Sequence, residues 1–169
     1  MRMVFAAIMS LLVVTDAAAQ SKRPIEGVWK IVERITPAGN PRAGGAAVTQ
    51  DDPQPNLLIF TSRYYSEIIV MGGQARAAVP APVNPLQVTD AEKAALYDQW
   101  RPFTANSGTY EVARSILVRH PIVAKNVDVM ARGKGIPVEL RFDDANTVWL
   151  LPIEEFAKTE PRLKLTRLE

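Results

Sequence analysis

His120 is the single histidine of this 169-residue chain, and it stands at the end of a strand-like segment, directly before a proline. An imidazole has an ordinary pKa of about 6.5, which suits both a general acid or base and a polar anchor for a ligand. A buried histidine held by backbone hydrogen bonds would have the same neighbours in the sequence. The residue therefore indicates two alternatives, a ligand-contacting group and a structural one.

Aromatic side chains also stand in strand-like segments, at Tyr64, Tyr65, Tyr110 and Trp149. Because successive strand residues face opposite sides, only one of Tyr64 and Tyr65 can face an enclosed interior. Such rings either belong to a core or line a cavity with a hydroxyl or N–H group directed at a ligand. We select Tyr64, Tyr110 and Trp149, together with His120, as candidate ligand-binding residues.

Three arginines are further candidates for holding a ligand carboxylate or enolate: Arg76, Arg119 and Arg141. Arg141 has apolar neighbours on both sides, so it faces outward if those neighbours face inward. Arg119 and His120 are adjacent and cannot both face the same side of a strand. We expect His120 to face the interior and Arg119 to face outward.

Several other chemistries lack the residues that they need. The chain has no cysteine, which excludes disulfides and thiol catalysis. A lone histidine does not favour a zinc site, and nothing in the sequence pairs Glu111 with Glu139 as a glycosidase would require. Neither a Gly-x-Ser-x-Gly motif nor a glycine-rich phosphate loop is present. We expect no metal and no cofactor.

The first and last strand-like segments of the chain indicate the kind of sheet that must position these side chains. Gly27 and Trp29 open the first strand-like segment, and Arg167 lies in the last one. A small antiparallel barrel closes by pairing its first and last strands. The guanidinium could then stack on the indole ring, a contact worth roughly 0.5–2 kcal/mol, and cap one end of the barrel. The sequence therefore predicts a cup that is open at the other end.

The remaining segments fit that barrel. Strand-like segments cover 29–35, 56–61, 64–71, 108–113, 115–120, 126–130, 136–142, 147–151 and 163–168. One helix begins after Thr89, which forms a capping box with Glu92, and ends before Pro102. We expect this helix to pack against the barrel or close one end. Loops at 36–55 and 72–85 are rich in Pro, Gly and Ala, and the first is a candidate lid. The predicted fold is all-β, an antiparallel barrel of about eight strands with one inserted α-helix.

The start of the chain has the features of a secretory signal over residues 1–19. Arg2 is followed by an apolar stretch, and Ala17 and Ala19 fit a small-x-small cleavage site. The stretch is too short for a spanning helix. We expect residues 20–169 to form a single periplasmic or secreted domain. The net charge of +2, without a cluster of Lys and Arg, does not favour nucleic acid as a partner.

An ordered set of short motifs points to one family. The motifs are IEGVWKIV at 25–32, RYY at 63–65, Arg76, TDAE at 89–92, SGTYEV at 107–112, VRH at 118–120, ELRF at 139–142 and LTR at 165–167. Over most of the length after the signal, the chain resembles the bacterial and fungal lipocalin-like domain family. The resemblance implies a lipocalin-like antiparallel barrel.

Three functions fit this interpretation. We favour a secreted protein that binds a small apolar or amphipathic molecule in the barrel lumen, with His120 and Tyr110 fixing its orientation. The second is a cofactor-independent isomerase or cyclase that uses His120 as acid or base in the same lumen. The third is a structural envelope domain with a filled lumen and an exposed apolar patch. Binding is preferred to catalysis, and the ligand is not specified.

Overall fold

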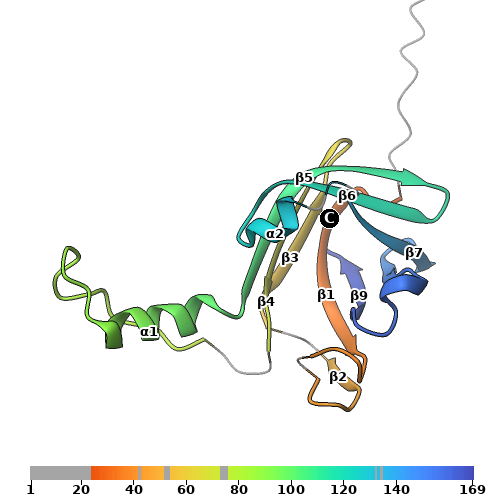
Figure 1. The fold of residues 1–169 in the computed structure, drawn as a ribbon. Helices are drawn as coiled ribbons and strands as arrows, with labels where there is room; N and C mark the ends of the chain where they lie inside the picture. The colour runs from red at the N-terminus through yellow and green to blue at the C-terminus, as the bar shows by residue number, and fades with distance from the viewer. Residues whose placement is uncertain (1–23, 42, 52–53, 73–75, 132, 134) are drawn as a thin grey trace, which may run out of the picture.

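Short segments of alternating apolar residues form one antiparallel sheet in the computed structural model, which describes residues 24–41, 43–51, 54–72, 76–131, 133 and 135–169. In this part of the chain the strands are β1 (Gly27–Thr36), β2 (Val48–Asp51), β3 (Asn56–Phe60), β4 (Tyr64–Val70), β5 (Phe103–Ala113), β6 (Ile116–Ala124), β7 (Ile136–Asp144), β8 (Thr147–Pro152) and β9 (Arg162–Arg167). They lie in the order β2-β1-β3-β4-β5-β6-β7-β8-β9. Because β1 also pairs with β9, eight strands close into a barrel and β2 lies outside it (Figure 1).

The predicted antiparallel barrel is confirmed, with two local differences. β2 forms within the segment that we expected to be only a loop, and it pairs with the end of β1. The predicted strand at 126–130 is instead a short helix, α2 (Val127–Met130), because the side chain of Asn126 accepts from the amide of Asp128 and caps it. A turn of 3₁₀ helix, η1 (Glu154–Phe156), precedes β9. The predicted signal, residues 1–19, lies outside the described residues.

The barrel interior is filled by the inward residues of all eight strands. Its core members are Ile25, Trp29, Ile31, Leu58, Phe60, Tyr65, Ile69, Tyr110, Leu117, Leu140, Val148, Leu150 and Leu165. Simple alternation predicts that Ile35 faces inward with Trp29. A β-bulge between Ile31 and Glu33 shifts the phase, so that Arg34 is buried instead.

One end of the barrel is closed by the predicted contact between Trp29 and Arg167. The guanidinium carbon lies 4.1 Å from the centre of the indole ring. The same group donates to the carbonyls of Pro24, Glu26 and Ala145 at 2.6, 2.5 and 3.0 Å. The Arg167 side chain therefore ties the segment before β1 to the turn between β7 and β8.

Gly27 is required at this end by both its conformation and its surroundings. Its φ of +143° is one that residues with a side chain rarely adopt. A Cβ atom placed there would collide with the Arg167 guanidinium and with the carbonyl of Glu169. The glycine of the Gly-x-Trp motif therefore makes room for the arginine that covers the tryptophan.

Helix α1 (Asp90–Trp100) begins as predicted but does not pack as predicted. The Thr89 hydroxyl accepts from the Glu92 amide, and the Glu92 carboxylate accepts from the Thr89 amide. The helix has no buried residue and extends away from the barrel (Figure 1), so the expectation that it covers or closes the barrel is wrong. Its few large apolar side chains do not form a stripe that could hold it on the sheet. No helix among the described residues is long and apolar enough to cross a membrane.

Candidate functional site

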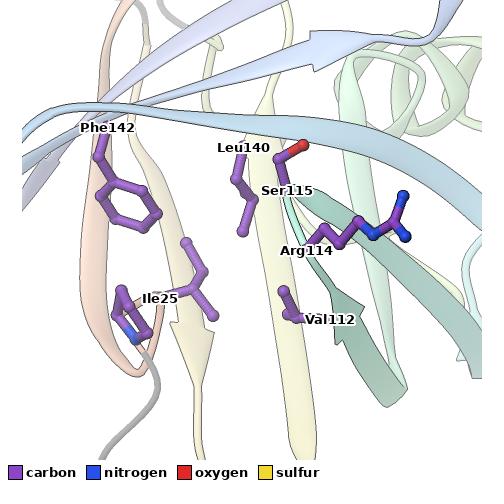
Figure 2. A pocket seen from close by; sticks show the side chains of 7 residues that line it. Ile25, Val112, Arg114, Ser115, Leu140 and Phe142 are labelled. Carbon is purple, nitrogen blue, oxygen red and sulfur yellow. The ribbon is translucent and has the colours of Figure 1, made fainter.

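A pocket of about 260 Å³ lies at the closed end of the barrel, beside the turn between β5 and β6. Figure 2 shows side chains from three regions around it: the segment before β1, the β5–β6 hairpin and β7. The lining residues are Pro24, Ile25, Val112, Arg114, Ser115, Leu140 and Phe142. Five of these seven side chains are apolar, and the pocket is slightly smaller than the 300–1,000 Å³ of most drug-sized ligand sites.

The apolar walls of this pocket follow from strand alternation. Leu140 and Phe142 are two residues apart in β7, and both face the interior side, which agrees with the expected outward position of Arg141. Ile25 is held beneath them, because its carbonyl accepts a 2.8 Å hydrogen bond from the indole N–H of Trp29. The Leu140 amide donates to the Ser115 carbonyl at 2.6 Å, which joins β7 to the hairpin turn.

Arg114 gives the pocket its charge. It occupies the turn between β5 and β6 with a φ of +56°, the only positive value at a non-glycine position among the described residues. The left-handed conformation costs roughly 1–2 kcal/mol for a residue with a side chain. In Figure 2 its aliphatic stem lies at the rim and its guanidinium extends away from Phe142. The pocket is therefore apolar inside and cationic at the rim.

A second feature of the interior is a buried polar cluster formed by Tyr65, Glu67, Asn106 and Arg119, each less than 9% exposed. The Tyr65 hydroxyl donates to the Asn106 side-chain oxygen at 2.6 Å, and the Asn106 amide lies 3.5 Å from a Glu67 oxygen. Arg119 forms an ion pair with Glu67. Arg119 Nε has no hydrogen-bond partner among the described residues, the only buried side-chain nitrogen or oxygen there in that state.

The pKa of Tyr65 reflects these surroundings. Burial raises the pKa to about 12 from an ordinary value of 10.0; the nearby Arg119 charge opposes the shift and the Glu67 charge adds to it. The phenol therefore keeps its proton to a higher pH than an exposed tyrosine, and its O–H group is the donor to Asn106.

Arg34 is a further buried cation, on another wall of the barrel. Its cross-strand partner in β9 is Leu163, which packs against the core, and its Nη1 lies 2.8 Å from the Met71 sulfur. Strand β1 is four positions from β6 around the closed barrel, so Arg34 and Arg119 project from opposite walls. The polar cluster and the apolar pocket occupy different levels of the interior, since Asn106 and Val112 lie near opposite ends of β5.

The structure places one of the four predicted ligand-binding residues inside the barrel. Tyr110 is 5% exposed, its hydroxyl donates to the Thr61 carbonyl at 2.5 Å, and its ring meets Phe60 edge to face. Tyr64 is 50% exposed on the outer face, beside Arg63.

Trp149 and His120 also lie outside. Trp149 stands between two inward, fully buried residues of β8, and its indole N–H donates to Asp143 at 3.1 Å. His120 contacts the exposed Glu111 carboxylate at 3.2 Å. The four predicted side chains are therefore not gathered into one site, and ligand contact by any of them stays a prediction.

The expectation that His120 faces inward and Arg119 outward is wrong. The two do alternate, as expected, but Arg119 is 8% exposed and faces the interior, whereas the His120 side chain is 41% exposed. Arg119 can face the interior because Glu67 supplies a buried carboxylate partner. His120 and Tyr110 face opposite sides of the sheet, so the acid–base arrangement of the isomerase or cyclase alternative is not assembled.

Sequence reasoning misses the residues that define both interior features. Glu67 shares the face of Tyr65 by alternation, so choosing Tyr65 as the inward tyrosine would have placed a carboxylate inside. Ile25 and Arg114 give no comparable signal, because one lies before the first strand and the other in a turn. Among the described residues, no group of three acidic or histidine side chains is arranged to hold a metal ion.

Comparisons with known proteins add little to this description. No family model matches the sequence, and no curated protein matches it. The structure is similar to the crystal structure of a lipocalin-like protein from Bacteroides uniformis, with 10% sequence identity and a TM-score of 0.46. The similarity covers 86% of this chain and 100% of that chain. The strands themselves define the class: a closed antiparallel eight-stranded barrel with an additional strand and an inserted helix.

Proposed function

We propose that this protein binds a small apolar or amphipathic molecule at the closed end of the barrel, with the apolar part of the ligand in the pocket beside Ile25 and Phe142. The observation that carries the proposal is the pocket of about 260 Å³, with mainly apolar walls, at one end of a closed barrel. A concave, largely apolar site with a few polar groups is the usual form of a small-molecule site.

The expected affinity follows from burial of the ligand chain. Each buried methylene contributes about 0.8 kcal/mol, so two additional methylenes strengthen binding by about 1.6 kcal/mol, or roughly fifteenfold. Because association itself costs at least about 4 kcal/mol, short chains bind weakly. A series of ligands is therefore more informative than one affinity.

The test is a titration of the protein with 1-hexanol and 1-octanol, followed by NMR. We expect saturable binding, with 1-octanol at least several times tighter, and the largest shifts at Val112, Leu140 and neighbouring amides. Val112→Phe fills the pocket and should weaken binding about tenfold. Val123→Phe is the matched control, because Val123 is 60% exposed. Absence of saturable binding, or equal binding by both variants, would refute the proposal.

We also propose that the protein is exported after cleavage of residues 1–19. The support is the charge and apolar pattern of this segment together with the small residues at its end. Expression of the full chain in a bacterial host, fractionation and N-terminal sequencing test it directly. A periplasmic product that begins at Gln20 or Ser21 supports export, and a cytoplasmic product that retains Met1 overturns it.

A further inference from the structure

Arg114 adopts a left-handed backbone conformation in the turn between β5 and β6, which destabilises the folded state relative to glycine at the same position. Among the described residues, the other positions with positive φ are all glycines: Gly27, Gly44, Gly45, Gly72 and Gly135. Glycine would fit the turn without the steric penalty of about 1–2 kcal/mol that a side chain brings. Strained residues of this kind concentrate at functional sites.

The position of Arg114 shows what its side chain offers. It is the one charged residue among the seven that line the pocket. Its side chain makes no hydrogen bond or ion pair with another described residue, so no carboxylate of this part of the chain neutralises it. Ser115 adds a hydroxyl group to the same rim (Figure 2). The rim therefore carries a cation and a neutral hydrogen-bonding group beside an apolar interior.

We infer that the ligand of this pocket is an amphipathic monoanion, a straight-chain carboxylate whose head group binds Arg114 while its chain lies against Ile25, Leu140 and Phe142. The inference rests on the proposed function and adds the chemical class of the ligand. The guanidinium lies beyond the rim and away from Phe142, which separates charge from apolar surface as in an elongated amphipathic molecule (Figure 2).

The donor set favours a carboxylate over a phosphate monoester. A guanidinium presents a planar fork that matches the two oxygens of a carboxylate. A phosphate monoester carries nearly two negative charges at neutral pH, and no second cation lines the pocket. One positive charge at the rim balances one negative charge of the ligand.

The experiment compares octanoate with 1-octanol, which share a chain of the same length, at pH 7. NMR titrations measure both dissociation constants for the wild type, Arg114→Gln, Arg114→Gly and Arg141→Gln. Arg141→Gln removes the same charge from an exposed position on the outer face and is the matched control. Arg114→Gly relieves the left-handed strain at the turn, and a urea unfolding curve of this variant separates loss of the guanidinium from loss of the fold.

In the wild type and in Arg141→Gln, we expect octanoate to bind about tenfold more tightly than 1-octanol, because hydrogen bonds to charged groups are the stronger ones. Both Arg114 variants should abolish that preference, so that octanoate and 1-octanol bind them with about equal affinity. Equal binding of the two ligands to the wild type, or a preference that survives in Arg114→Gln, overturns the inference while the proposed function stands. Failure of both ligands to bind refutes the proposed function itself.

Discussion

Removing one partner of the buried Glu67–Arg119 pair should destabilise the barrel strongly. The two side chains are 11% and 10% exposed, so neither charge is screened well by water. Breaking a buried pair from one side typically costs about 3–5 kcal/mol, because the remaining charge is left in the interior. Since domains of this size have a free energy of unfolding of about 5–15 kcal/mol, Glu67→Leu should remove a large part of it.

Removing both partners should have a much smaller effect. Well-packed apolar replacements of a buried pair are often neutral or stabilising by about 1–4 kcal/mol. Here the double variant Glu67→Leu/Arg119→Met also eliminates the buried Nε group that lacks a partner among the described residues. Besides the pair itself, it removes the long 3.5 Å contact between Asn106 and Glu67. We therefore expect the double variant to be at least about 2 kcal/mol more stable than Glu67→Leu alone.

Urea unfolding of the wild type, both single variants and the double variant closes a double-mutant cycle. Equal m-values would show that all four proteins expose similar amounts of surface when they unfold. If Glu67→Leu cost less than about 1 kcal/mol, or if the two single effects simply added, the pair would not be the buried electrostatic unit that the distances indicate.

Three further predictions concern the closed end and the buried tyrosine. Arg167→Met should destabilise the protein by about 2–4 kcal/mol in urea unfolding, because the variant loses the ring contact with Trp29 and three hydrogen bonds to carbonyls; an effect below about 0.5 kcal/mol contradicts this. Gly27→Ala should cost at least about 1 kcal/mol and lower the melting temperature, and an unchanged value would rule out the predicted collision with Arg167. Because folding raises the pKa of Tyr65 from 10.0 to about 12, the stability that the neutral phenol provides is present below pH 10 and is lost as the pH rises toward 12. Unfolding curves of the wild type and Tyr65→Phe across this range should therefore converge, and parallel curves contradict the shift.

The fold is predictable because the barrel depends on patterns that are local in the sequence. Apolar alternation marks the strands around Trp29 and Leu140, and the Thr89–Glu92 capping box marks the start of α1. The pairing of the first and last strands follows from barrel closure, so the Trp29–Arg167 contact can be expected from the sequence alone. The capping box predicts the start of α1 but not its packing, because a well-capped helix that lacks an apolar stripe has no face to bury.

The candidate site is less predictable because it depends on which face of each strand turns inward. Alternation states correctly that Arg119 and His120 face opposite sides, but it does not say which side is inside. That choice depends on a carboxylate fifty-two positions away, Glu67, which balances Arg119 within the barrel. A one-residue bulge in β1 likewise turns Arg34 toward the interior, where simple alternation would place Ile35.

Together these two cases explain why the interior contains charged side chains that alternation alone does not assign to it. An inward-facing charge is tolerated only where a partner from another strand reaches the same level, and strand register fixes that level. The Tyr65–Glu67–Asn106–Arg119 cluster meets this condition on three adjacent strands, β4, β5 and β6. Arg114 does not, because its turn lies at the barrel end and no described side chain pairs with it. The guanidinium of Arg114 is therefore available to a ligand, because no side chain of the described residues balances its charge. Arg119, which is paired with Glu67, has a structural role instead.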